Sequence, residues 1–136
     1  MRKRNEIASQ LREVYKNNPE SARPFLEKGL NAGFLKGLGF SAKTLKEEFG
    51  FNAYILRELN FKAKDLANDF SPLMLVQAGF NAAELKEAGI DARQLRVLGA
   101  RKMLDIGFGV MDLKQAGISR KVIEAALKKR KRQGFN

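Results

Sequence analysis

The 136-residue sequence contains no cysteine, no histidine and no tryptophan, and only three prolines. Without cysteine there is no disulfide framework and no thiolate metal site. Histidine is the commonest general base and cysteine the strongest side-chain nucleophile, so both are missing from any catalytic site. No apolar run approaches the roughly 20 residues that cross a bilayer. These absences predict a non-enzymatic protein with no catalytic residues, no metal site, no cofactor and no transmembrane segment.

Acidic residues are also scarce, with 15 Asp and Glu against 26 Lys and Arg, which gives a net charge of +11. Such an excess favours a polyanionic partner: nucleic acid, an anionic membrane or an acidic protein. The excess lies at the ends of the chain. Residues 1–30 carry +3, residues 91–120 carry +3 and residues 121–136 carry +5, whereas 31–60 and 61–90 are near neutral.

The basic start of the chain resembles the charged head of a signal peptide. Residues 5–10, which follow Met1-Arg2-Lys3-Arg4, are mostly polar and do not form the apolar core that such a peptide requires. We therefore expect an intracellular protein, cytoplasmic or, in a eukaryotic or viral setting, nuclear, and not a secreted one.

A ten-residue pattern recurs along most of the chain and is clearest in residues 79–88 and 89–98. Each copy begins with glycine, an apolar residue, a helix-capping residue and alanine, and has leucine in seventh place. The capping residues Asn81 and Asp91 are followed three positions later by Glu or Gln, the signature of a capping box. The glycine that opens the next copy, such as Gly99, is expected to end the helix in the left-handed conformation. The pattern predicts helices of seven residues joined by tight turns.

Copies of varying quality follow one another at intervals of 8 to 11 residues. Their second, seventh and tenth positions are apolar, and the fourth is usually small. Isolated helices shorter than about 12 residues are marginal in water, so these apolar columns must be buried against neighbouring repeats. That is the logic of a solenoid. We predict an all-α, single-domain solenoid of short helices with about ten residues per repeat, an N-terminal capping helix and a basic C-terminal helix or arm.

The sequence divides into three segments. Residues 1–18 comprise a basic start and an amphipathic helix over 5–17, which Pro19 ends and which covers the end of the repeat stack. Residues 19–127 form the repeat array. Residues 128–136 form a basic tail, either a fraying helix end or a flexible arm.

The segment A-G-F-N-A-A-E-L-K-E-A-G-I-D-A-R-Q-L (residues 78–95) resembles the short AGF-x-A-x-x-L-K helical repeats of bacterial, protist and viral proteins. The resemblance covers roughly residues 29–127 and is to a repeat type that implies no particular activity. An alternative is a compact bundle of DNA-binding helices of the SAP or helix–extended-loop–helix kind. Those modules need longer helices than these repeats allow, so the solenoid is favoured.

The acidic side chains show no catalytic or metal-binding pattern. They fall mostly at outward repeat positions, often beside a lysine, which predicts a solvated helix face with i,i+4 ion pairs. The G-x-G steps at residues 37–39 and 107–109 lack the strand and the long helix of a nucleotide-binding turn. The carboxylates concerned are Glu47, Glu48, Glu58, Asp65, Glu84, Glu87, Asp105 and Asp112.

The fifth and sixth positions of each repeat are expected to point outward. They vary freely in sign and polarity, which argues against a uniform phosphate track and against a base-reading code like that of Pumilio-type proteins. These pairs are residues 43–44, 54–55, 64–65, 73–74, 83–84, 93–94 and 111–112.

The basic side chains near the two ends are the candidate nucleic-acid-binding residues, because Lys and Arg contact phosphates without reading sequence. DNA and RNA are both open as partners, and the competing interpretation of the tail is a solubility device or a nuclear-localisation signal. The candidates are Arg2, Lys3, Arg4, Arg93, Arg96, Arg101, Lys102, Arg120, Lys121, Lys128, Lys129, Arg130, Lys131 and Arg132.

The alternative function is a protein–protein interaction scaffold that uses the solenoid face. The longest apolar run is Leu73-Met74-Leu75-Val76, inside a stretch from Ser71 to Ala78 without charge. Its outward members would form an apolar patch for a protein partner or for self-association. Burial of this repeat is the favoured interpretation. A membrane-surface role for the basic final helix is disfavoured because it lacks the bulky aromatic face that such helices use.

Overall fold

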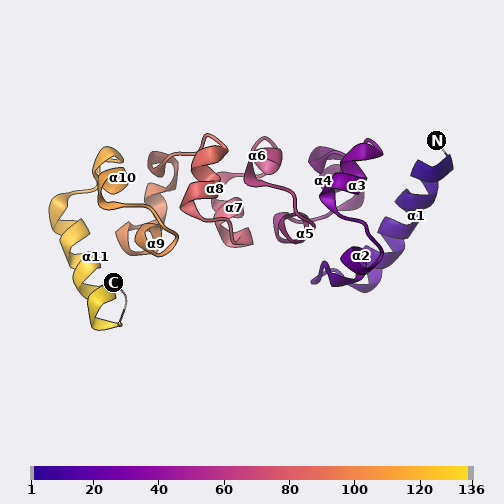
Figure 1. Ribbon diagram of the computed structural model, residues 1–136. Helices are drawn as coiled ribbons and strands as arrows, with labels where there is room; N and C mark the ends of the chain where they lie inside the picture. The colour runs from indigo at the N-terminus through magenta and orange to yellow at the C-terminus, as the bar shows by residue number, and fades with distance from the viewer. Residues whose placement is uncertain (1, 135–136) are drawn as a thin grey trace. The chain divides into compact units, whose positions relative to one another are not determined.

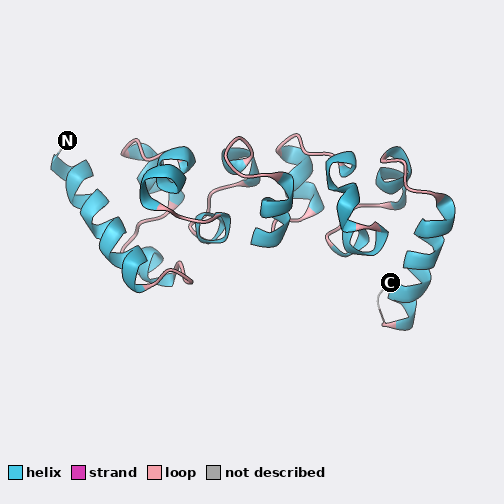
Figure 2. Ribbon diagram, turned by 180° about the vertical axis from the view of Figure 1, so that it is seen from behind, coloured by secondary structure: helices cyan, strands magenta, loops and turns pink. Residues whose placement is uncertain are grey.

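The computed structural model describes residues 2–134, and this part of the chain contains twelve short helices and no strand (Figure 1). Figure 2 shows that short loops join the helices. The chain is thus an all-α solenoid of short helices, as the repeat pattern predicts. It divides into two compact units, Met1–Gly79 and Phe80–Asn136. Residue 1 of the predicted N-terminal segment and residues 135–136 of the predicted tail lie outside the described residues.

The first unit contains seven α-helices: α1 (Arg2–Asn17), α2 (Arg23–Glu27), α3 (Ala32–Gly37), α4 (Ala42–Phe49), α5 (Ala53–Glu58), α6 (Ala63–Leu66) and α7 (Pro72–Ala78). The second unit contains α8 (Ala82–Glu87), the 3₁₀-helix η1 (Ala92–Leu98), α9 (Ala100–Asp105), α10 (Val110–Gln115) and α11 (Arg120–Arg132).

Helix α1 begins at Arg2 and not at residue 5, because its basic first residues are good helix formers and Arg4 lies on an aromatic ring of the repeats. It buries Ile7, Leu11 and Val14. The Tyr15 ring lies 4.3 Å from the Phe51 ring, and its hydroxyl donates a hydrogen bond to the Gly50 carbonyl. The helix therefore covers the repeats at the start of the first unit, as predicted.

The helix starts follow the predicted chemistry. In seven repeats the N-cap side chain accepts a hydrogen bond from the backbone N–H three residues later, which satisfies a donor that the helix itself leaves unpaired. The two predicted capping boxes are confirmed, since Glu84 and Gln94 accept in turn from the N–H groups of Asn81 and Asp91. The capping residues are Asn31, Ser41, Asn52, Ser71, Asn81, Asp91 and Ser119.

The prediction of an α-helix was wrong for the repeat of residues 89–98, which forms a 3₁₀-helix over Ala92–Leu98. The following repeat is two residues short, so Gly99 closes η1 and is at the same time the N-cap of α9. The greater rise per residue of a 3₁₀-helix lets the chain reach α9 without the usual turn. Gly99 consequently has φ 85° and ψ 159°, a region that only glycine occupies readily, and not the left-handed helical conformation.

The core consists of the predicted apolar columns. The apolar residue near the start of the repeats and at least one apolar residue of each short helix, in most repeats a leucine, are buried. No polar or charged residue among residues 2–134 is buried. Within the first unit, α4 packs against α6 and α5 against α7. The Ala32 amide donates to the Leu59 carbonyl, and in the second unit the Ala82 amide donates to the Ile106 carbonyl. Within each unit, a repeat therefore contacts the one two places further along.

Candidate nucleic-acid interface

Helix α11 presents a basic face to solvent. Ile123 and Ala126 are buried, which fixes the opposite side of the helix as the exposed one. Lys121, Lys128 and Arg132 follow one another on that side at i, i+7 and i+11, a stripe about 16 Å long at 1.5 Å per residue. We call these three residues the α11 stripe. Among residues 2–134 no carboxylate forms an ion pair with any of them.

Lys129 and Lys131 lie on either side of the α11 stripe and are exposed. All the basic residues from Lys128 to Arg132 continue the helix, so the alternative of a flexible arm is wrong for this segment. Two effects explain the extended helix: Lys and Arg are good helix formers, and cations near the C-terminus interact favourably with the helix dipole.

Arg130 has a different role from its neighbours. Its Nε lies 3.0 Å from Asp105 Oδ1, and only 17% of its side chain is exposed. This ion pair joins α11 to α9, the helix against which it packs. Arg130 therefore holds α11 in place, and the cations around it are left to face solvent.

Helix α9 adds two cations to the same unit. Its buried residues are Ala100, Met103 and Leu104, so Arg101 and Lys102 lie with Asp105 on the remaining side. Lys102 is exposed and Arg101 half-buried. Asp105 pairs with Arg130 of α11. Arg101 and Lys102 therefore lie on the side of α9 that also carries the contact with α11.

The other predicted cations of the second unit have contacts of their own. Arg120 pairs with Glu124 one turn later, at 3.0 Å. Arg93 Nε lies 3.8 Å from an Asp91 oxygen. The Arg96 guanidinium lies against Gly117 at the start of the last repeat. These side chains contribute to the positive charge of the unit, but they are less available to phosphates than the α11 stripe.

The N-terminal cations lie in the first unit and are partly engaged in packing. Lys3 Nζ lies 6.0 Å from the centre of the Phe34 ring, and the Arg4 guanidinium 5.0 Å from the centre of the Phe40 ring. Both contacts are cation–π interactions, which stabilise the docking of α1. Arg2 is exposed. The structure thus gives Lys3 and Arg4 a packing role that the sequence pattern did not indicate.

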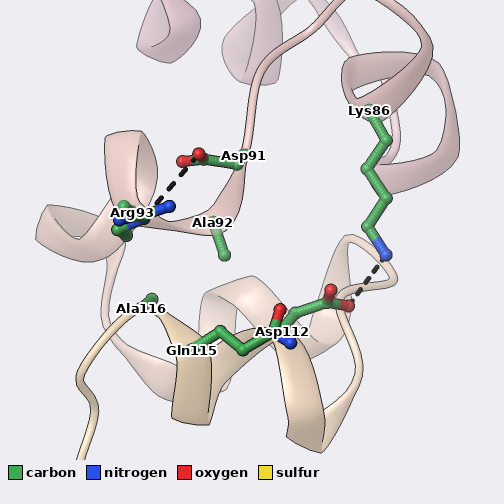
Figure 3. A pocket seen from close by; sticks show the side chains of 7 residues that line it. All are labelled: Lys86, Asp91, Ala92, Arg93, Asp112, Gln115 and Ala116. Carbon is green, nitrogen blue, oxygen red and sulfur yellow. Dashed lines mark hydrogen bonds and ion pairs between the residues drawn. The ribbon is translucent and has the colours of Figure 1, made fainter.

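A hollow of about 280 Å³ lies beside Arg93 in the second unit (Figure 3). Figure 3 shows Lys86 and Asp112 pointing toward one another across part of it, with 2.9 Å between Nζ and Oδ2. The second pair, Arg93 and Asp91, lies on another wall. Its positive and negative side chains are already matched, so the hollow offers little net charge to an ionic ligand.

Among residues 2–134 there is no group of three or more side chains that could hold a metal ion. None of the described helices combines the length and the apolar character that crossing a membrane requires.

Comparison with known protein families identifies a decapeptide repeat region over residues 29–102, more than half of the chain. The chain belongs to the decapeptide repeat family. In this decapeptide-repeat protein the matched segment ends at Lys102, so α10 and α11, with the α11 stripe, lie beyond it. No curated protein and no solved structure matches the chain.

Three lysines of the decapeptide repeats make contacts that sequence reasoning missed. Each directly follows the buried leucine of its repeat and reaches the aromatic residue that opens the repeat three places later. Lys36 lies over the Phe61 ring, Lys46 over Phe70 and Lys86 over Phe108, at 5.4, 4.9 and 5.7 Å from the ring centres. Lys46 also donates a hydrogen bond to the Asp69 carbonyl. The recurrence of lysine directly after the buried leucine was the sequence feature that could have indicated these contacts.

Two carboxylates complete these contacts. Lys36 Nζ lies 2.8 Å from Asp65 Oδ2, which also accepts from the Lys62 N–H; Asp112 Oδ2 accepts from Lys86 and from the Gly109 N–H. The expected i,i+4 pairing is therefore wrong for Asp65, Asp112 and Asp105. Their partners lie 25 to 29 residues away in the sequence, because successive turns of the solenoid bring distant repeats together.

Hydrogen bonds set the ionisation of these two groups. The bond from Lys86 and then that from the Gly109 N–H lower the pKa of Asp112 below its ordinary value of 3.8. Burial raises the pKa of Asp65, but the hydrogen bonds from Lys36 and the Lys62 N–H outweigh it, so that the pKa is lowered as well. Both carboxylates are thus held ionised for structural reasons.

The lowered pKa of Asp112 predicts an acid-dependent loss of stability. Its contribution is fully present above 3.8 and is lost as the pH falls through the lower pKa of the folded state. We expect Asp112→Asn to reduce the loss of unfolding free energy between about pH 5 and pH 2, measured by urea unfolding with circular dichroism. Lys86→Gln is the matched control, since it keeps the carboxylate and should shift the pKa of Asp112 upward. An unchanged pH profile in both variants would contradict the prediction.

The apolar run in α7 is only half buried. Leu75 and Val76 face the core, but Leu73 and Met74 are 37% and 43% exposed, so the expectation of burial was wrong for these two. Pro72 begins the helix, and its first turn leaves them on the outer side. Met74 and Tyr54 of α5 line a hollow of about 190 Å³.

Ile55, which the repeat pattern placed outward, is fully buried. Helix α5 packs against α7 and buries Ala53, Ile55 and Leu56, which lie on more than one side of so short a helix. The outward set expected from the repeat pattern is therefore incomplete at α5.

Proposed function

We propose that this decapeptide-repeat protein is a non-enzymatic, intracellular module that binds nucleic acid through the phosphate backbone. The observation that supports this most directly is the α11 stripe: three exposed cations in line on one rigid helix, flanked by Lys129 and Lys131. Lysine and arginine contacts with phosphates supply affinity without sequence preference.

The charge of the second unit points the same way. Residues 80–136 contain 13 basic and 6 acidic residues, a net charge of +7. Three of the acidic groups, Asp91, Asp105 and Asp112, form ion pairs with cations outside the α11 stripe. Their partners are Arg93, Arg130 and Lys86, respectively. The positive field around α11 is therefore little compensated, and such a field attracts a polyanion over a Debye length.

The test is a fluorescence-polarisation titration of the full chain into labelled random duplex DNA at several salt concentrations. Apart from Arg120, which pairs with Glu124, the five exposed cations of α11 are Lys121, Lys128, Lys129, Lys131 and Arg132. If each of these five makes one phosphate contact, the slope of log K against log[salt] is about −4.5. Binding that weakens with this steepness supports the proposal. Absence of binding at low salt would overturn it.

A second candidate function is a protein-interaction scaffold, which the exposed apolar residues of the first unit favour. Leu26, Tyr54 and Met74 are exposed on α2, α5 and α7. Tyr54 borders two shallow hollows, one shared with Leu26 and the other with Met74. Apolar side chains grouped in this way are typical of protein contact surfaces. In that case Met74→Ala would weaken partner binding, and added salt would change it little.

A further inference from the structure

We infer that the nucleic acid bound by α11 is double-stranded; this inference rests on the proposed function. The first argument is the lack of any surface on which unpaired bases can stack. Proteins that bind single strands combine cations with exposed aromatic rings, and each stacked base contributes about 1–3 kcal/mol. In the described part of the second unit the aromatic residues are Phe80 and Phe108, and each is only 2% exposed.

The second argument is the rigidity of the basic surface. Ile123 and Ala126 are buried beneath α11, and the Arg130–Asp105 ion pair anchors its last turns to α9. The backbone positions that carry the cations of the α11 stripe are consequently held at fixed intervals. A duplex presents phosphates at fixed intervals too, so the two arrays meet without the ordering cost that a flexible single strand would bring.

The third argument is charge density. A duplex carries one phosphate charge per about 1.7 Å of its axis, so the stripe of about 16 Å faces roughly ten charges. Counterion release per contact is also larger for duplex DNA, with a slope of about −0.9 against about −0.7 for single strands. With five contacts, this difference alone amounts to about tenfold in affinity at 0.1 M salt relative to 1 M.

The side chains of α11 further indicate which part of the duplex is contacted. Apart from the paired Arg120, the exposed part of the helix carries five cations, together with Glu124, Ala125 and the apolar side chains of Val122 and Leu127. The five cations are Lys121, Lys128, Lys129, Lys131 and Arg132. It has no Asn or Gln between Arg120 and Arg132 that could read adenine, and no exposed aromatic ring for a base step. We therefore expect the backbone to be contacted with little dependence on sequence.

The experiment is competition at 0.1 M salt against a labelled 20-base-pair duplex, with the full chain. Unlabelled duplex DNA, duplex RNA and single-stranded DNA of the same sequence are compared at equal phosphate concentration. We expect the DNA duplex to compete at about one-tenth of the concentration that the single strand needs. The RNA duplex distinguishes which duplex geometry fits better.

The outcomes separate the inference from the proposed function. Single-stranded DNA competing as well as duplex DNA would overturn the inference and leave nucleic-acid binding intact. No binding of any of these nucleic acids would overturn both. The variant Phe135→Ala is included because it removes the remaining aromatic residue of the second unit. The duplex preference should persist in it, and a preference that depends on Phe135 would contradict the argument from α11.

Discussion

Replacement of Phe51 by alanine is expected to lower the free energy of unfolding by about 3–5 kcal/mol, the usual cost of deleting a buried aromatic side chain. The Phe51 ring is 1% exposed and lies 4.3 Å from the Tyr15 ring, 5.3 Å from Phe25 and 6.2 Å from Phe49, measured between ring centres. These three residues lie in or at the ends of α1, α2 and α4. One side chain therefore joins the N-terminal helix to the first repeats, and its loss leaves a cavity into which the surrounding short helices can move only in part.

Urea unfolding followed by far-UV circular dichroism measures this loss, and tyrosine fluorescence reports on it locally because Tyr15 is in contact with the substituted ring. Phe34→Ala is the matched control. Phe34 is 37% exposed on α3 and contacts Lys3, so its replacement is expected to cost less, about 1–2 kcal/mol. Equal losses for the two variants would show that the repeat columns do not carry the stability of the first unit.

The repeat architecture was predictable because each repeat contains the residues that determine its own local structure. Asn81 and Asp91 are capping residues with the partners that a capping box requires, and the buried columns recur once per repeat, as the stacking of repeats requires. Local propensity and burial pattern agree at nearly every repeat. When local preference and burial pattern agree in this way, the fold can be predicted from a single sequence.

The η1 repeat was not predictable from its own residues. Asp91, Ala92 and Leu95 occupy the same places as in the preceding repeat, which is α-helical. The difference comes from the next repeat, which is two residues shorter and draws the chain directly into α9 at Gly99. A helix type set by the length of its neighbour cannot be derived from the pattern inside the repeat.

The contacts between repeats were missed for a related reason. Lys86 and Asp112 are 26 residues apart, and only the number of repeats per solenoid turn makes them neighbours. The sequence shows that each residue is charged and that each follows or precedes a buried leucine. It does not show how many repeats complete a turn. Pairing within one helix was therefore expected where pairing between turns is found.

The basic residues of the candidate interface were predictable from the sequence, but which of them face solvent and which one packs against α9 was not. The five basic residues from Lys128 to Arg132 are indistinguishable in sequence, yet Arg130 faces α9 and its neighbours face solvent. This distinction follows from the 100° turn per residue of α11 and from the acidic residue that α9 presents to it. Once the buried side of α11 is known, the cations that face solvent are known as well.

Triple replacement of Lys121, Lys128 and Arg132 by glutamine is expected to weaken duplex DNA binding by about 10²–10³-fold at 0.1 M salt relative to 1 M, because three phosphate contacts are lost. The salt slope should fall in magnitude by about 2.7. Glutamine is a good helix former, so α11 should persist. All three residues lie on the exposed side of the helix, and circular dichroism of the variant should match that of the parent chain.

A control variant removes the same charge from elsewhere. Lys28, Lys43 and Lys62 are exposed in the first unit, and their replacement by glutamine lowers the net charge of the chain by the same three units. If the α11 stripe is the contact surface, this variant retains most of its affinity and nearly all of its salt slope, because screening limits the influence of remote charges. If both triple variants lose affinity equally, the attraction comes from the net charge of the molecule, and the assignment of the interface to α11 is wrong.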